Sequence, residues 1–164
     1  MKITKKTIFA IVEAALFITA IFMLFAPAVR YSNEFMGVKV TEEISCFQMA
    51  FGSDDKGTKF AFVAFLSFLF LVAGAVLACL KIFVIKDAKA QKIVNIVILV
   101  LGIVAGIFYF CSKTGLMANL DGVDASDVAD MLKEWNLGVG AIFAAILAIA
   151  AGAVACVDEF VVKE

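Results

Sequence analysis

Glu13 is the residue in this sequence that could do chemistry inside an apolar segment. It is the one acid within the apolar stretches defined below, and ionisable groups at membrane depth are functional candidates. Glu13 could conduct or couple a proton or cation. Asn95 would be its polar neighbour, because it lies near the same inner end of the apolar stretches. The simpler interpretation is that it pairs with a lysine near the inner interface, such as Lys81 or Lys92. No continuous polar pathway through the other apolar stretches is visible.

Four cysteines could support thiol chemistry, and they divide by position along the chain. Cys46 and Cys111 are expected on the outer side, where a Cys46–Cys111 disulfide could tie a loop to the helices. Cys79 and Cys156 are expected at inner helix ends, as small buried residues. Four-helix membrane thiol oxidoreductases of the vitamin K epoxide reductase type use a C-x-x-C motif, and this sequence has none.

Other catalytic signals are missing from the sequence. It contains no histidine, which removes the commonest general base and metal ligand. It has no nucleotide-binding, zinc or nucleophile-elbow motif. Acids recur at every third position in one loop, but their spacing is not that of a calcium-binding EF-hand, and acids are favourable near a helix N-terminus anyway; they are Asp121, Asp124, Asp127 and Asp130. We therefore predict no catalytic residue, cofactor or metal, and no enzyme.

The composition places the chain in a membrane. Hydrophobic residues make up 64% of the 164 residues, whereas a soluble domain has about 45–50%. About 20 apolar residues cross a bilayer as a helix, and none of the apolar stretches alternates as a barrel strand would. The first stretch resembles a secretory signal, but its length and Glu13 favour a retained helix. The predicted spans within one domain, 1–164, are 7–29, 58–82, 93–112 and 137–157.

Lysine placement predicts the orientation of these spans. Short segments rich in lysine stay on the cytoplasmic side of a membrane. The N-terminal segment and the inner linker 83–92 are such segments, whereas the outer loops 30–57 and 113–136 are long and hold most of the acids. We therefore expect a multi-pass protein of the plasma membrane with both termini cytoplasmic. The lysines concerned are Lys2, Lys5, Lys6, Lys81, Lys86, Lys89 and Lys92.

Small residues at regular spacing predict how the helices pack. Lipid provides no hydrophobic force between helices, so close backbone approach matters. The fourth span has a small residue at every fourth position, and the third contains Gly102 and Gly106. We favour packing within one four-helix bundle over a dimer interface, although the latter stays open. The stripe in the fourth span is Gly140, Ala144, Ala148, Gly152 and Cys156.

The first outer loop predicts strands followed by a short helix. In "EFMGVKV", Met36, Val38 and Val40 alternate with other residues at the period of a half-buried strand. "VRYS" is the expected partner strand, with "NE" at the turn. "ISCFQMAFG" follows with helical spacing, and Gly52 is expected to end that helix.

The second outer loop predicts a short amphipathic helix. Asp124 is a good N-cap, and Val123 and Val128 form the pair expected of a hydrophobic staple. Val128, Met131, Leu132 and Trp135 would share one face, with Trp135 as an anchor at the membrane interface. The predicted fold class is thus an all-α membrane protein: a four-helix transmembrane bundle with a small outer β-hairpin and a short outer helix.

The layout resembles that of claudin-type four-span proteins, with a short inner linker, a strand-bearing first outer loop and a smaller second one. The claudin W-x-G-L-W…C…C signature is absent, since Cys46 stands alone in that loop and the single tryptophan is Trp135. The likeness therefore implies a topology and does not carry over a barrier function. The layout is equally similar to that of small four-span proteins of bacteria.

Three functions follow as hypotheses. The leading one is a non-enzymatic membrane protein whose outer layer contacts a membrane-protein partner or organises a homo-oligomer. The second is a small oligomeric transporter or channel that uses Glu13. The third is a thiol-redox protein that uses Cys46 and Cys111. The lipid bilayer is an expected partner in each case, and a net charge of −1 gives no reason to expect nucleic acid.

Overall fold

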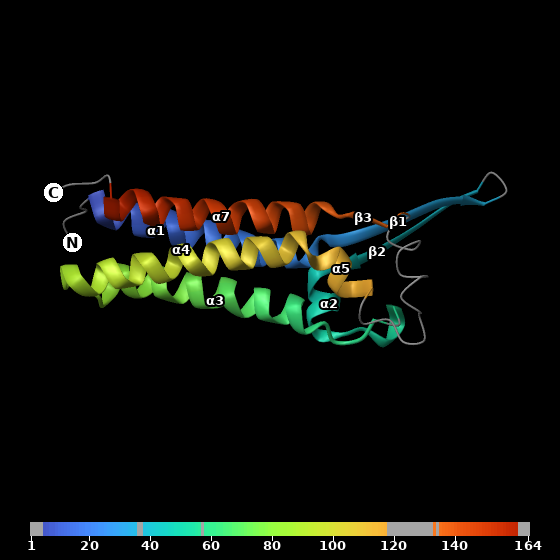
Figure 1. The fold of residues 1–164 in the computed structure, drawn as a ribbon, viewed down its shortest axis with the longest axis horizontal. Coiled ribbons are helices and arrows are strands. Elements are labelled where there is room, and N and C mark those ends of the chain that lie inside the picture. The colour runs from blue at the N-terminus through green and yellow to red at the C-terminus, as the bar shows by residue number, and fades with distance from the viewer. Residues whose placement is uncertain (1–4, 36–37, 57, 118–132, 134, 161–164) are drawn as a thin grey trace.

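The computed structural model describes residues 5–35, 38–56, 58–117, 133 and 135–160. Four long helices lie side by side, and a small sheet lies at one end of them (Figure 1). We call this end the sheet end. We call the opposite end, where the first helix begins and the last one ends, the terminus end. The linker between α3 and α4 also lies at the terminus end.

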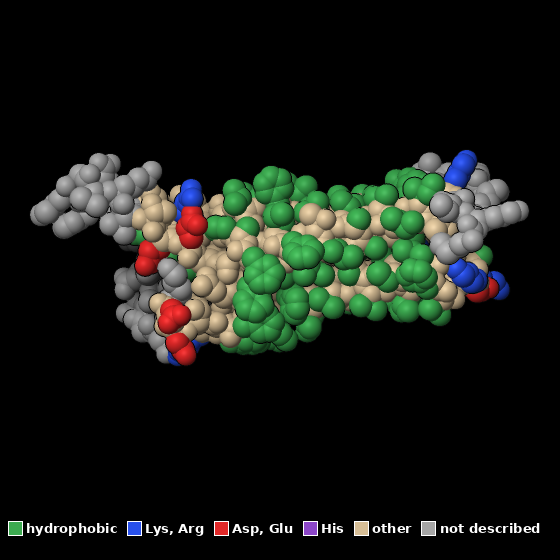
Figure 2. Space-filling model, turned by 180° about the vertical axis from the view of Figure 1, so that it is seen from behind, with side chains coloured by type: hydrophobic (Ala, Val, Ile, Leu, Met, Phe, Trp, Pro, Cys, Tyr) green, Lys and Arg blue, Asp and Glu red, His purple; other side chains and the backbone are tan. Residues whose placement is uncertain are grey.

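The four long helices confirm the predicted bundle of spans. Each is long and apolar enough to cross a membrane. Hydrophobic side chains cover the middle of the face shown in Figure 2, and charged side chains lie at its two ends. The chain is therefore a multi-pass membrane protein by the length and composition of its helices. The helices are α1 (Lys5–Phe22, followed by the 3₁₀ turn η1, Met23–Phe25), α3 (Phe62–Phe83), α4 (Ala88–Phe110) and α7 (Val139–Phe160).

Several span boundaries differ from the predicted ones. The first helix ends well before residue 29, because Ala26 is extended and Pro27 begins a strand. The third begins at Ala88 rather than 93, because the Asp87 side chain caps it and accepts a hydrogen bond from the Ala90 N–H at 2.9 Å. The linker is accordingly shorter than 83–92. The fourth helix continues to Phe160, three residues beyond the predicted end.

The sheet has three antiparallel strands in the order β2–β1–β3. These are β1 (Pro27–Phe35), β2 (Val38–Ser45) and β3 (Trp135–Leu137). The first two form a hairpin in the first long loop. The turn predicted at "NE" is wrong, because Asn33 pairs with Val40 and Glu34 with Lys39, and pairing continues to the end of both strands.

Trp135 lies in a strand and not on a helix. It is the first residue of β3, which pairs with β1 in the register Tyr31 to Trp135. The Trp135 ring is buried, with its centroid 5.4 Å from that of Tyr31. Most of the amphipathic helix predicted over 123–135 lies outside the described residues. Trp135 therefore stabilises the sheet rather than anchoring a helix at the interface.

The short helix α2 (Cys46–Phe51) forms where the sequence indicated. Ser45 and Gln48 make a capping box: the Ser45 Oγ accepts from the Gln48 N–H at 3.2 Å, and the Gln48 Oε1 accepts from the Ser45 N–H at 2.9 Å. The helix ends at Gly52, as predicted, where φ is +81° and a side chain would be strained. Two further short elements, η2 (Asp54–Lys56) and α5 (Ser112–Met117), lie in the long loops.

The capping box gives the first expected result. Replacing Ser45 with Ala removes the acceptor for the Gln48 N–H, so we expect a loss of about 1 kcal/mol in the free energy of unfolding. Denaturation of the purified protein in mixed micelles measures it. Thr41→Ala, at an exposed position of β2, is the control. Equal stability of the two variants would show that the cap does not contribute.

The small residues of α4 and α7 pack against each other inside the molecule. A Cβ added to Gly102 would collide with the carbonyl oxygen of Ala148, and one added to Gly152 would lie 3.1 Å from the carbonyl oxygen of Leu99. The stripe on α7 is buried from Gly140 to Gly152, while Cys156 is half-buried. These glycines thus serve packing within the bundle, in agreement with the favoured prediction.

Candidate functional site: a buried ionic cluster

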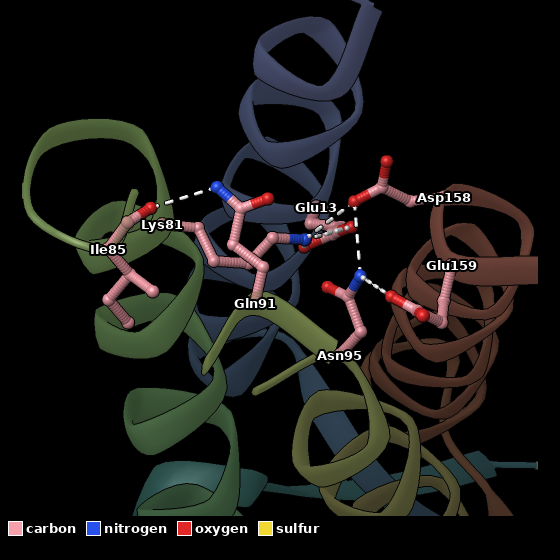
Figure 3. A network of polar contacts seen from close by, with 7 residues as sticks. All are labelled: Glu13, Lys81, Ile85, Gln91, Asn95, Asp158 and Glu159. Atoms are coloured by element: carbon pink, nitrogen blue, oxygen red, sulfur yellow. Dashed lines mark hydrogen bonds and ion pairs between the residues drawn. The ribbon is translucent and has the colours of Figure 1, made fainter. Parts of the chain in front are cut away.

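A cluster of polar side chains lies inside the bundle at the terminus end. Each of the four long helices contributes one residue: Glu13 from α1, Lys81 from α3, Asn95 from α4 and Asp158 from α7 (Figure 3). We call these four residues the polar cluster. Glu159 lies at its edge and is partly exposed.

The Lys81 ammonium group is at the centre of the contacts. Its Nζ donates to both carboxylate oxygens of Glu13, at 2.9 and 2.8 Å, and to Oδ2 of Asp158 at 3.1 Å. The Asn95 Nδ2 donates to the same Asp158 oxygen at 3.2 Å and to Glu159 Oε2 at 3.3 Å. One cation and one amide thus link three carboxyl groups.

The polar cluster is almost fully removed from solvent. The exposed fractions are 0% for Glu13, 2% for Asp158, 3% for Asn95 and 6% for Lys81. Moving a charged group out of water costs several kcal/mol even after the protein relaxes. Such charges persist only when their partners are well placed, so the contacts of Lys81 are essential to this end of the bundle.

Helical periodicity explains how four distant residues meet. Each polar residue lies on the buried face of its own helix. Lys81 comes three residues after buried Ala78, and Asp158 comes three residues after buried Ala155. The buried face that packs the bundle therefore carries a polar residue near the same end of every long helix.

The sequence predicted part of the polar cluster. Glu13 pairs with Lys81, one of the two lysines proposed for it, whereas Lys92 is exposed. Asn95 lies in the same cluster, but its hydrogen bonds go to Asp158 and Glu159 and not to Glu13. Trp135, the third candidate, lies apart in the sheet at the other end.

Asp158 was missed because the fourth span was predicted to end at residue 157. The statement that Glu13 is the only acid within a span is accordingly wrong. The signal was present in the sequence: Ala144, Ala148, Ala151 and Ala155 are buried at helical spacing. Continuing that spacing by three residues reaches Asp158.

Two acceptor atoms of the polar cluster have no partner. The second carboxylate oxygen of Asp158, Oδ1, and the amide oxygen of Asn95 are both buried without a hydrogen bond. Among the described residues, no group of three or more His, Cys, Asp or Glu is placed to hold a metal ion. The polar cluster therefore provides charged groups and two buried acceptor atoms that make no hydrogen bond.

Apolar side chains fill the core on the sheet side of the polar cluster. Phe17, Leu71 and Ile98 are fully buried there. The Phe17 ring packs so closely on α3 that a Cβ on Gly74 would lie 2.6 Å from it. Buried Ser67 donates its hydroxyl hydrogen to the Val63 carbonyl of its own helix, at 2.8 Å. In the described interior, the ionic side chains of the polar cluster are thus bordered on the sheet side by apolar side chains.

The cysteines of the third hypothesis are free thiols in the structure. Cys46, the first residue of α2, is buried, and Cys111, at the end of α4, is exposed. The disulfide between them is therefore not formed. Burial raises the pKa of the Cys46 thiol to about 12, so this group stays protonated at neutral pH and is a poor nucleophile.

This difference in burial predicts selective labelling. Alkylation of the folded, unreduced protein is expected to modify Cys111 and to leave Cys46 unmodified until the protein unfolds. Mass spectrometry of the digested protein measures both sites. If both residues stay unmodified in the unfolded protein and react only after a reductant is added, they form a disulfide and the thiol-redox hypothesis gains support.

No family model matches the chain, and neither the curated proteins nor the solved structures that were compared with it give a match. The claudin-like layout is therefore neither supported nor refuted by relatives.

Proposed function

We propose that the chain is a non-enzymatic protein of the plasma membrane with both termini in the cytoplasm, and that its sheet end contacts a partner outside the cell. The partner is another membrane protein or a second copy of the chain. The observation that carries this proposal is the β1–β2 hairpin, which extends beyond the ends of the helices (Figure 1).

Charge distribution supports the orientation. Lysines gather where α1 begins and where α4 begins, both at the terminus end, and cytoplasmic loops are enriched in such residues. Acids of the first long loop lie at the sheet end, as Figure 2 shows. The lysines are Lys5, Lys6, Lys86, Lys89 and Lys92, and the acids are Glu42, Glu43, Asp54 and Asp55.

Among the residues that the structure describes, the hairpin has strand edges without a partner. Strand β3 covers β1 only from Val29 to Tyr31, so from Ser32 to Phe35 β1 pairs with β2 alone. Strand β2 is an edge strand along its length. A two-stranded hairpin is marginally stable by itself, and an open strand edge pairs readily with another chain. A partner chain that pairs with the β1–β2 hairpin would stabilise the hairpin and satisfy its open strand edge.

Site-specific crosslinking in the native membrane tests the proposal. A photoreactive amino acid at Thr41, an exposed position of β2, is expected to form an adduct heavier than the monomer. The matched probe at Lys89, exposed at the terminus end, is expected to form none. An adduct of twice the monomer mass identifies a second copy. Monomer alone at Thr41, or equal adducts at both positions, would contradict the proposal.

Reporter tags test the orientation separately. Tags inserted at residue 53 and at residue 86 are expected on opposite sides of the membrane, with 86 in the cytoplasm. Detection of both tags on one side would overturn the proposed topology without affecting the crosslinking result.

The polar cluster favours a second candidate function, transport that uses Glu13. Ionisable groups within a span often mark proton or ion pathways. Against this, the described core on the sheet side of the cluster is apolar and closely packed. Flux measurements on the protein in proteoliposomes test this function. Proton or cation flux that Glu13→Gln abolishes would support transport. Equal flux in the wild type and the variant would exclude this role of Glu13.

A further inference from the structure

The polar cluster contains one more acid than its bases can balance. Glu13 and Asp158 are both buried, and among the described residues Lys81 is the single cation that reaches them. The other described groups that face them are the neutral Asn95 and the partly exposed Glu159. If all groups were ionised, the buried centre would carry a net charge of −1. An uncompensated charge is strongly disfavoured in an apolar interior, and a carboxyl group there takes up a proton instead.

The unpartnered atoms point independently to a missing hydrogen. Asp158 Oδ1 and Asn95 Oδ1 belong to side chains more than nine-tenths buried, and neither accepts a hydrogen bond. In Figure 3 the Asn95 amide oxygen points into the cluster, and the free oxygen of Asp158 carries no contact. Leaving buried acceptors unsatisfied is costly, so each of these atoms could accept a hydrogen from a protonated carboxyl group or from a water.

The contacts also distinguish the two acids. Both oxygens of Glu13 accept hydrogen bonds from Lys81. Asp158 gives Lys81 only one oxygen, at the longer distance of 3.1 Å. The ammonium group already lies between the carboxylates, where a metal ion would have to bind and would be repelled.

We propose that the polar cluster is a proton-binding site, in which Glu13 and Asp158 together hold one proton taken from water beside the Lys81 ammonium group. In this state the buried centre is neutral. Loss of the proton leaves two carboxylates with one cation, so their repulsion pushes α1 and α7 apart at the terminus end. The site acts at the end opposite the hairpin and does not depend on the function proposed for it.

Infrared spectroscopy of the full-length protein in lipid nanodiscs at neutral pH tests the proposal directly. The wild type is expected to show the carbonyl band of a buried protonated carboxylic acid, shifted in heavy water. Glu13→Gln and Asp158→Asn are each expected to lose this band, because either change leaves one carboxylate for one ammonium group. Glu159→Gln, at the edge of the cluster, is expected to retain it.

Each result is decisive. Loss of the band in both amide variants, together with its presence in Glu159→Gln, supports the site. Absence of the band in the wild type overturns it, because both carboxyl groups are then ionised and a second cation must balance the charge. Survival of the band in either amide variant, or its loss in Glu159→Gln, also overturns it. If one amide variant does not fold, the wild type and the other variant suffice.

Discussion

Replacement of Lys81 by Met is expected to lower the free energy of unfolding by about 3–5 kcal/mol, the usual cost of removing one partner from a buried ion pair. Methionine fills a similar volume, so the loss comes from charge and not from a cavity. Glu13 and Asp158 would remain buried without their cation. Unfolding of the purified protein by SDS in mixed micelles measures the effect.

Two further variants separate this effect from a general sensitivity of the helix ends. Lys92→Met removes an exposed lysine from the same end of the bundle, so no measurable change is expected. Combining Lys81→Met with Glu13→Gln and Asp158→Asn makes the cluster neutral and should recover most of the loss, as buried ion pairs replaced by neutral groups often do. Equal stability of Lys81→Met and the wild type would contradict the observed contacts.

Replacement of Gly102 by Val is expected to have an effect of similar size, about 3 kcal/mol or more, through overpacking. A Cβ at this position would meet the Ala148 carbonyl and lie 3.1 Å from the Gly152 nitrogen, and both are backbone atoms. A flexible side chain could move away, but here α4 and α7 would have to separate. The same unfolding measurement applies, and loss of folded protein from the membrane is the extreme outcome.

Ala153→Val is the matched control for Gly102→Val. Ala153 lies on the exposed face of α7, so the added methyl groups would meet lipid and should change stability by less than about 0.5 kcal/mol. If both variants were equally stable, the close packing of α4 on α7 would be contradicted. If both were equally unstable, the effect of Gly102→Val would not come from that contact.

The spans were predictable because each is a nearly continuous apolar run, and hydropathy reports such runs well. Helix ends were less predictable, because they depend on hydrogen bonds rather than apolarity. The first five residues of α4 include Lys89 and Lys92, so hydropathy assigned them to the linker, although the Asp87 cap shows where the helix begins. Capping signals would have corrected this boundary.

Contacts between segments that are far apart in the sequence could not be predicted from the residue pattern of either segment alone. Strand β3 has three residues, too few to show a period, and it exists because it pairs with β1 more than 100 residues earlier. The interpretation of Trp135 as the end of a helix failed for this reason. By contrast, the position of Asp158 in the buried interior could have been predicted from the sequence, because it continues the spacing of buried alanines along α7.

The order in which the ion-pairing residues occur along the chain constrains how the protein enters the membrane during synthesis. Glu13 emerges from the ribosome with the first span and has no cation partner until Lys81 follows in the second. A lone charged side chain is costly in lipid, so early association of these two spans is favoured at the insertion machinery. Asp158 arrives last, in a span that brings no lysine of its own. A chain truncated before α3 would hold Glu13 in the bilayer without Lys81, its partner in the complete protein.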